Sequence, residues 1–183
     1  GYNQLNLYGD SYGTRLALTV MRDFPQAVRS AVLDSTYPLE VNLYTSLALN
    51  AERAFNVLFD VCAADPICNS SYPDLRMVFY NLVDQLNANP ARVSLFVGGT
   101  NYDVLLDGNR LIDVLFVGLY NPAVIASMPR MIYQIQQGNY SILRERLSLY
   151  FDTSSALGMG LSVQCTEEVP FASMTDVYAA SKS

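Results

Sequence analysis

The chain has 183 residues, of which 51% are hydrophobic and 15% charged, a globular composition that allows one sizeable core or two small ones. Its net charge is −6 and its 11 Lys and Arg residues are thinly spread, so nucleic acid is not an expected partner. The most apolar stretch, 114–128, is interrupted by Asn121 and Pro122 and is shorter than the roughly 20 residues of a bilayer crossing, so it predicts buried helix and no membrane span.

The first 34 residues predict a strand, a sharp turn, a helix and a second strand. Residues 4–8 alternate in apolar character, residues 12–23 carry an apolar stripe at helical spacing, and residues 28–33 form a second apolar run that ends at Asp34. This order is a βαβ unit, which predicts two parallel strands. Because two such strands alone leave both sheet edges open, we expect the missing core strands to come from the rest of a longer parent chain or from another copy.

From residue 39 onward the pattern is mostly helical. Apolar residues at helical spacing predict helices over 44–62, 75–86, 111–119, 123–137 and 140–151. Two short runs, 93–97 and 102–106, predict a hairpin around a loop at 98–101. The predicted fold class is therefore α/β, with a small α/β part at 1–38 and a mostly helical domain at 39–183.

Two of the three cysteines lie close together in the sequence. Cys62 and Cys68 flank a short loop with Pro66 to turn it, and this loop would allow a disulfide that fastens a helix end. The alternative is a pair of reduced cysteines in a core. Their spacing and the absence of His from the sequence argue against zinc, so we expect no metal and no cofactor.

Residues 9–13, Gly-Asp-Ser-Tyr-Gly, fit the Gly-x-Ser-x-Gly pattern of a nucleophile elbow between a predicted strand and a predicted helix. Such a turn strains the serine backbone and needs small residues on both sides, which Gly9 and Gly13 provide. Ser11 is then the candidate nucleophile, and the backbone N–H of Tyr12 is the candidate oxyanion donor. The alternative is a polar loop without chemistry.

A serine nucleophile of this kind needs a His base held by an acid. The sequence contains no His, and its one Lys, Lys182, lies next to the chain end, so we predict that these residues form an incomplete fragment that is inactive alone. The order Ser, acid, His places the missing residues beyond Ser183. Asp34 is an alternative acid, although we expect it to cap the loop into the helical section instead.

Residues 7–14, together with 21–25 and 31–34, resemble the proline iminopeptidase and tripeptidyl aminopeptidase branch of the α/β-hydrolases. Residues 59–68 with Tyr72 and Pro73 resemble its secreted members, and 162–168 resemble a segment late in their cap. The resemblance implies a partial α/β-hydrolase core at 1–38 and a truncated helical cap at 39–183. It also implies an extracytoplasmic exo-peptidase that acts on peptide substrates with a free N-terminus, and a Cys165 that pairs with a cysteine farther along.

An aminopeptidase has to bind a free ammonium group, for which a desolvated carboxylate is suited. Glu167 and Glu168 are adjacent in the cap-like segment, and we predict that one of them binds the substrate amine. The alternative is a solvated pair at the start of a helix.

For the function of the whole protein, two other hypotheses remain: an esterase or lipase with the same elbow, and a non-catalytic binding module that has lost its His.

Overall fold

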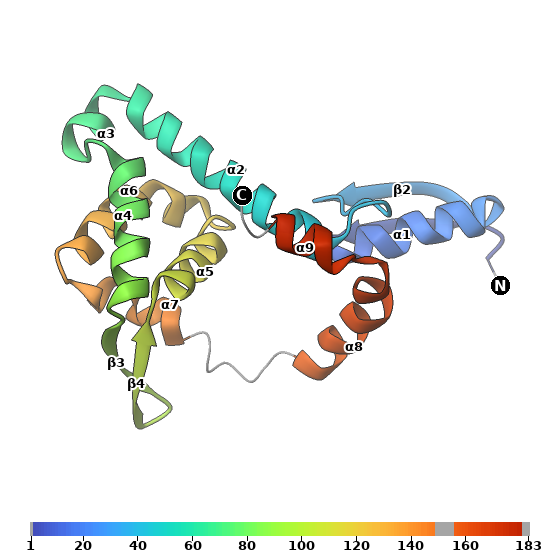
Figure 1. Ribbon diagram of the computed structural model, residues 1–183. Coiled ribbons are helices and arrows are strands. Elements are labelled where there is room, and N and C mark those ends of the chain that lie inside the picture. Colours follow the sequence, from blue (N-terminus) through green and yellow to red (C-terminus); the bar gives the residue numbers. More distant parts are fainter. Residues whose placement is uncertain (1, 149–155, 181–183) are drawn as a thin grey trace. The chain divides into compact units, whose positions relative to one another are not determined.

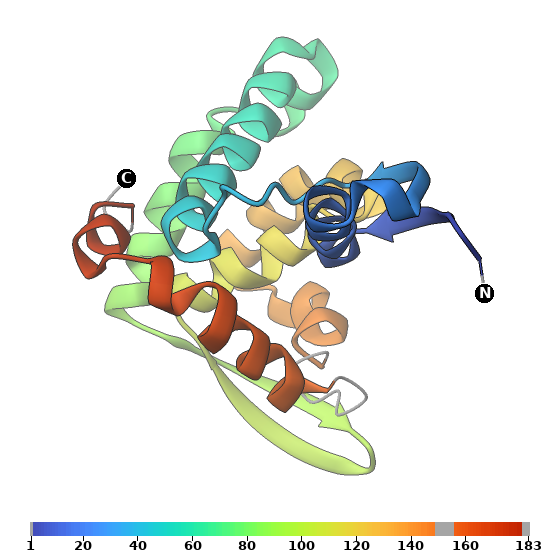
Figure 2. The ribbon, with the colours of Figure 1, turned by 90° about the vertical axis from the view of Figure 1, so that its right-hand side faces the viewer.

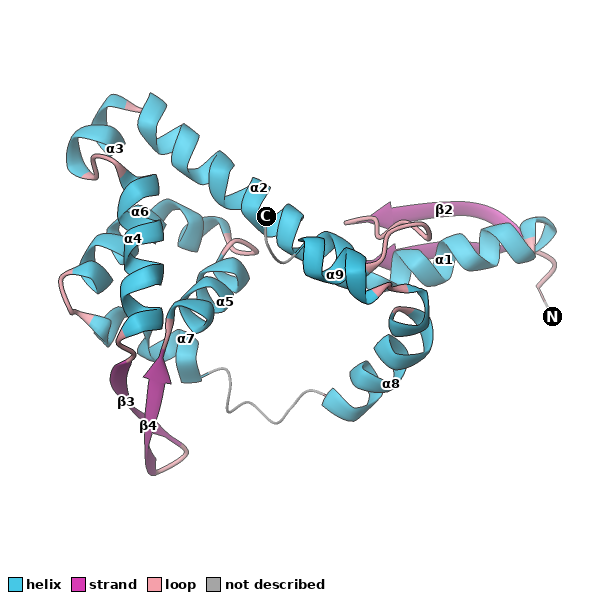
Figure 3. Ribbon diagram, in the orientation of Figure 1, coloured by secondary structure: helices cyan, strands magenta, loops and turns pink. Residues whose placement is uncertain are grey.

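The computed structural model describes residues 2–148 and 156–180 (Figure 1). These residues combine many helices with two small two-stranded sheets, so the chain has mixed α/β structure (Figure 3). They divide into two compact units, one from Gly1–Ala48 with Leu161–Ser183 and the other from Leu49–Gly160. Each unit is described by itself below.

The first unit begins with the predicted βαβ arrangement. Strand β1 (Leu5–Asp10) is followed by helix α1 (Tyr12–Asp23), a 3₁₀ turn (Pro25–Ala27) and strand β2 (Val28–Asp34). The two strands pair in parallel, and α1 packs against both of them. The predicted parallel pair and its crossover helix are therefore confirmed, with each strand slightly longer than expected.

Segments from distant parts of the sequence complete this unit. They are the start of α2 (Leu43–Ala64), the end of α8 (Leu157–Glu167), a 3₁₀ turn (Val169–Phe171) and α9 (Met174–Ala180). Large apolar side chains of the sheet stay exposed, among them Leu5, Tyr8 and Val32. The two strands thus present apolar surface that the described residues do not cover.

The second unit is mostly helical. After the rest of α2 it contains α3 (Pro66–Ser71), α4 (Leu75–Ala88), β3 (Ala91–Val97), β4 (Thr100–Leu106), α5 (Gly108–Gly118), α6 (Pro122–Gln136), a 3₁₀ turn (Tyr140–Leu143) and α7 (Arg144–Ser148). Its core is one apolar cluster in which Phe55, Phe59 and Phe79 stack on each other. Side chains cap α5 and α6 at their N-termini, since Asp107 accepts from the N–H of Arg110 and Asn121 from that of Ala123.

Two details of the predicted elements differ from the structure. The turn of the β3–β4 hairpin is only Gly98 and Gly99, both with positive φ, so Thr100 and Asn101 belong to β4 and not to a four-residue loop (Figure 2). Two consecutive left-handed residues match the twist of a two-residue hairpin turn, which explains the shorter loop. The predicted helix over 140–151 is a 3₁₀ turn followed by the short α7, and its last three positions lie outside the described residues.

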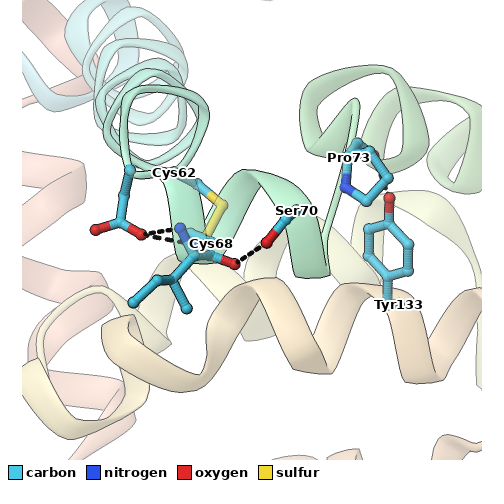
Figure 4. Close-up of a disulfide and its surroundings, with 7 residues drawn as sticks. Cys62, Cys68, Ser70, Pro73 and Tyr133 are labelled. Atoms are coloured by element: carbon cyan, nitrogen blue, oxygen red, sulfur yellow. Dashed lines mark hydrogen bonds between the residues drawn. A yellow bond between two sulfur atoms is a disulfide. The ribbon is translucent and has the colours of Figure 1, made fainter.

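The predicted disulfide is confirmed (Figure 4). Cys62 at the end of α2 is bonded to Cys68 in α3, with their Cα atoms 5.1 Å apart. Asp65 caps α3 by accepting hydrogen bonds from the N–H groups of Ile67 and Cys68, which holds the intervening turn. Tyr133 of α6 donates a hydrogen bond to the carbonyl of Pro73, just beyond α3.

Among the described helices, none has both the length and the apolar character that crossing a membrane would require.

Candidate functional site

Ser11 occupies the sharp turn between β1 and α1. Its backbone has φ 52° and ψ −120°, which a residue with a side chain adopts only at a cost of about 1–3 kcal/mol. Its N–H donates to the carbonyl of Asp34 at 3.0 Å, which ties the turn to the end of β2, and the residue itself is exposed. The strained, exposed serine that the elbow pattern predicts is therefore present.

The two glycines of the pattern are not equivalent. A Cβ atom on Gly9 would lie 2.6 Å from the carbonyl oxygen of Gly13 and 2.8 Å from the nitrogen of Thr14, so only glycine fits there. A Cβ atom on Gly13 would meet no atom of the described residues within 4 Å. Within the described part of the chain, the need for a small residue is therefore seen at Gly9 and not at Gly13.

Thr14 holds the elbow to the loop that follows β2. Its side chain is completely buried, and its hydroxyl donates to the carbonyl of Ser11 at 2.6 Å. The same hydroxyl accepts a hydrogen bond from the backbone N–H of Tyr37 at 2.8 Å. One small side chain therefore fixes the carbonyl of Ser11 against a segment 23 residues away.

Tyr12 contributes to the site through both its backbone and its side chain. As the first residue of α1, it has an N–H with no carbonyl four residues earlier in the helix to bind, so this group is suited to a developing negative charge. Its hydroxyl donates to the carboxylate of Glu167, with oxygen–oxygen distances of 2.9 and 2.8 Å. Burial and the hydrogen bond to Glu167 raise the pKa of the Tyr12 phenol above its ordinary value. Glu167, at the end of α8, is thus brought next to Tyr12, the residue that follows Ser11.

Glu168 lies buried beside this site, with 4% of its surface exposed. Its Oε1 accepts a hydrogen bond from the hydroxyl of Tyr37 at 2.6 Å and pairs with Nη1 of Arg15 at 3.0 Å. Its Oε2 accepts from the N–H of Leu43 at 2.9 Å. Burial and the contact with Glu168 raise the pKa of Tyr37 to about 12. Since both carboxylate oxygens already have partners, Glu168 has little capacity for a ligand.

The two adjacent glutamates therefore differ in their burial and in their partners. Glu167 is partly exposed, and each of its carboxylate oxygens lies within hydrogen-bond distance of the single hydroxyl of Tyr12. It retains lone pairs that can accept from a cation. Neither glutamate is the fully solvated side chain of the alternative reading, because both contact the first helix of the chain.

The expectation that Asp34 caps the loop into the helical section is wrong, because its side chain binds no backbone N–H at the start of α2. Its carboxylate accepts hydrogen bonds from Tyr8 at 3.4 Å and from Ser35 at 3.2 Å, and α2 begins only at Leu43. The charge of Asp34 is the largest cause that raises the pKa of the Tyr8 phenol. Asp34 approaches Ser11 through its backbone carbonyl, as the register of the two strands requires.

Sequence reasoning missed Thr14, Arg15, Tyr37 and Asn42. All four contribute polar contacts between the elbow helix, the loop after β2 and the end of α8, and Asn42 donates from Nδ2 to the backbone carbonyl of Glu168 at 2.8 Å. The contacts of Glu168 join residues more than 120 positions apart. A single sequence contains no signal for such pairings, because each partner taken alone looks like an ordinary polar residue.

The other parts of the described chain contain weaker candidates for a functional site. No three Cys, Asp or Glu side chains among the described residues are grouped in a way that could hold a metal ion. A cavity of ≈ 290 Å³ in the second unit is lined by residues that include Asp60, Asp74 and Arg76. The charge of Arg76 is already engaged, since it pairs with Asp60 at 2.7 Å and donates to Asn56. This cavity contains none of the predicted site residues.

Searches against protein-family profiles, curated proteins and solved structures find no match to this chain.

Proposed function

We propose that this chain is part of a serine hydrolase of the α/β-hydrolase fold, in which Ser11 forms an acyl-enzyme. The observation that carries the proposal is the backbone of Ser11, held at φ 52° in the turn between a strand and a helix of a parallel βαβ unit. A neutral loop gains nothing from this strain, whereas a nucleophile that must project beyond its strand does. In this proposal 1–38 belong to the hydrolase core and 39–183 to a helical cap.

The chemistry assigns one role to each group of the elbow. The hydroxyl of Ser11 attacks the substrate carbonyl, and the N–H of Tyr12 stabilises the negative charge that develops on the carbonyl oxygen. The scissile C–N bond then breaks, the leaving amine takes up the proton that the serine gave to the base, and water hydrolyses the resulting ester. A base has to take the serine proton, and the 183 residues contain no His. We therefore propose that residues outside this sequence supply the His and its acid, and that the chain alone has no turnover.

Glu167 is the group that we propose for binding the substrate's free ammonium. Its carboxylate is held beside Tyr12, next to the nucleophile in sequence, and it is partly exposed. A peptide whose ammonium binds there would have one of its first carbonyl groups close to Ser11, which is the arrangement an exo-peptidase needs. Glu168 is not suited to this role, because its ion pair and hydrogen bonds would have to break first.

The exposed apolar side chains of β1 and β2 support the proposal that further strands complete the core. Leu5, Tyr8 and Val32 are 48%, 69% and 57% exposed, which is unusual for a parallel sheet because such sheets are normally covered on both faces. We propose that the remaining strands come from the rest of a longer parent chain, with another copy as the alternative. The disulfide supports an extracytoplasmic location, since such bonds persist in oxidising compartments.

The test is turnover by the full-length protein that contains this chain. Aminoacyl-anilide and acyl-ester substrates would be compared in the wild type and in Ser11→Ala, with Ser30→Ala on β2 as an exposed control. An exo-peptidase hydrolyses the free-amine anilide and loses this activity in Ser11→Ala. Hydrolysis of the ester alone would favour an esterase or lipase instead.

One observation favours a second candidate, a non-catalytic binding module: the absence of His from the sequence. Such a module would keep the scaffold, and its Ser11→Ala variant would bind peptides as well as the wild type does. Complete inactivity of the full-length protein on both substrate classes, together with undiminished peptide binding by Ser11→Ala, would decide for the module.

A further inference from the structure

The buried charge cluster of Arg15, Tyr37 and Glu168 joins several segments of the first unit. Arg15 lies on α1, Tyr37 lies in the loop after β2, and Glu168 immediately follows α8. The guanidinium carbon of Arg15 is 4.6 Å from the centre of the Tyr37 ring, while both side chains bind the carboxylate of Glu168. Two side chains from two different segments therefore converge on the carboxylate of Glu168.

The cluster also binds the backbone around it. Arg15 donates from Nη1 to the carbonyl of Val41 at 3.0 Å and from Nη2 to that of Leu39 at 3.4 Å. Glu168 accepts from the N–H of Leu43 at 2.9 Å. The cluster thus fixes the loop between β2 and α2 as well as the end of α8, and its charges are turned inward instead of toward a ligand.

This arrangement determines where Glu167 lies. Glu167 is the last residue of α8, directly before Glu168, and its carboxylate meets the hydroxyl of Tyr12. Arg15 is on the same helix as Tyr12, less than one turn away. The ion pair therefore holds the Glu167 backbone against the helix that starts at the nucleophile. Apolar contacts have no preferred direction and would allow the segment of Glu167 and Glu168 to shift along α1. Hydrogen bonds and an ion pair to both carboxylate oxygens of Glu168 hold the segment in one position.

We propose that Glu168, held by Arg15 and Tyr37, is the positioning residue of the amine-binding site and thereby sets the preference for free over blocked N-termini. The inference rests on the proposed function, because it assigns the geometry of the same site. Glu168 itself does not touch the substrate; it holds the neighbouring Glu167 at a fixed distance from the nucleophile.

The experiment uses the full-length protein and a matched pair of substrates, one aminoacyl-anilide with a free amine and the same compound with an acetylated amine. Glu168→Gln is expected to raise KM for the free-amine substrate about tenfold, the effect of one misplaced charge-assisted bond, and to leave kcat within about twofold. Kinetics with the acetylated substrate are expected to stay unchanged. The milder Tyr37→Phe is expected to raise the same KM about threefold.

Two further variants separate positioning from folding. Arg15→Lys keeps the charge and is expected to retain more of the free-amine preference than Arg15→Gln. Asp23→Asn, in the exposed ion pair with Arg22 on the same helix, is the matched control and is expected to change neither substrate's kinetics. If Glu168→Gln does not fold, the KM of Tyr37→Phe for the free-amine and the acetylated substrate tests the proposal instead.

The inference is overturned if the preference ratio is unchanged in folded Glu168→Gln or Tyr37→Phe, or if both substrates lose activity in equal proportion. Failure of the proposed function looks different. The wild type then does not turn over the free-amine substrate, or Glu167→Gln affects the free and the acetylated substrate equally, and the inference falls with it.

Discussion

The hydroxyl of Tyr12 lies 2.9 and 2.8 Å from the two carboxylate oxygens of Glu167, although 155 positions separate these residues in the sequence. One end of Tyr12 therefore offers a backbone N–H beside Ser11, and the other end holds an acidic side chain from late in the chain. This relationship connects the elbow to the segment for which an amine-binding role was predicted. Glu167 makes this contact with Tyr12, whereas the buried Glu168 binds Arg15 and Tyr37 instead.

Substitution of the elbow glycines is expected to have unequal effects on stability. Gly9→Ala should lower the free energy of unfolding by about 2 kcal/mol or more, because the new Cβ would press against backbone atoms that cannot move aside. Gly13→Ala should change it by no more than about 0.5 kcal/mol, since the space around that position is open. Urea denaturation of the two variants provides the measurement, and equal destabilisation by both would contradict the close contact seen at Gly9.

Loss of the buried charge of Glu168 is expected to destabilise the first unit. Glu168→Gln leaves the guanidinium of Arg15 without its counter-charge in a buried position, which costs about 3 kcal/mol. The exposed pair of Arg22 and Asp23 is the control, and Asp23→Asn should leave the denaturation midpoint where it is. Denaturation followed by circular dichroism measures both. A midpoint for Glu168→Gln equal to that of the wild type would show that the ion pair adds no stability.

The phenol of Tyr37 is expected to titrate well above the ordinary value for a tyrosine. Its pKa of about 12 in the folded protein exceeds its ordinary value of 10.0, so folding favours the neutral form. Its stabilising contribution is fully present below pH 10 and is lost as the pH rises through about 12. Absorbance titration of tyrosinate should show one high-pH step in the wild type that is missing in Tyr37→Phe. A Tyr37→Phe titration curve that keeps this step would contradict the assignment.

Thiol counting tests the disulfide between Cys62 and Cys68. The folded chain should show one reactive thiol before reduction, that of the exposed Cys165, and all three after reduction. Replacing Cys62 and Cys68 by Ser should cost about 2 kcal/mol, the chain-entropy value for such a short loop. Cys165→Ser serves as the control and should leave stability unchanged. Three reactive thiols in the unreduced protein would exclude the bond.

Local sequence patterns were sufficient to predict β1, α1 and β2, the elements near the elbow. The alternating run before Gly9, the apolar stripe of α1 and the second run ending at Asp34 each predict a structure that neighbouring residues determine, and the parallel βαβ unit follows from their order. The hairpin loop was predicted too long because the pattern alone does not show that Gly98 and Gly99 both adopt positive φ. The short α7 was not separated from the 3₁₀ turn before it, because apolar spacing continues across both.

The site could be predicted only in part, for a physical reason. Ser11 and Tyr12 are marked by a local turn requirement, so the pattern finds them. The roles of Arg15, Tyr37 and Thr14 arise from contacts across long stretches of chain, which no local pattern encodes. The same contacts bury Glu168 and leave Glu167 partly exposed, a difference that their adjacent sequence positions do not show.

The most direct test of the central claim is the site at which a fluorophosphonate probe reacts with the full-length protein, located by peptide mass spectrometry. A serine hydrolase with the proposed elbow becomes labelled on Ser11, and Ser11→Ala abolishes the adduct, while the 183-residue chain alone is not labelled at ordinary rates. An absent adduct in the full-length protein, or one that persists in Ser11→Ala, would contradict the assignment of Ser11 as the nucleophile.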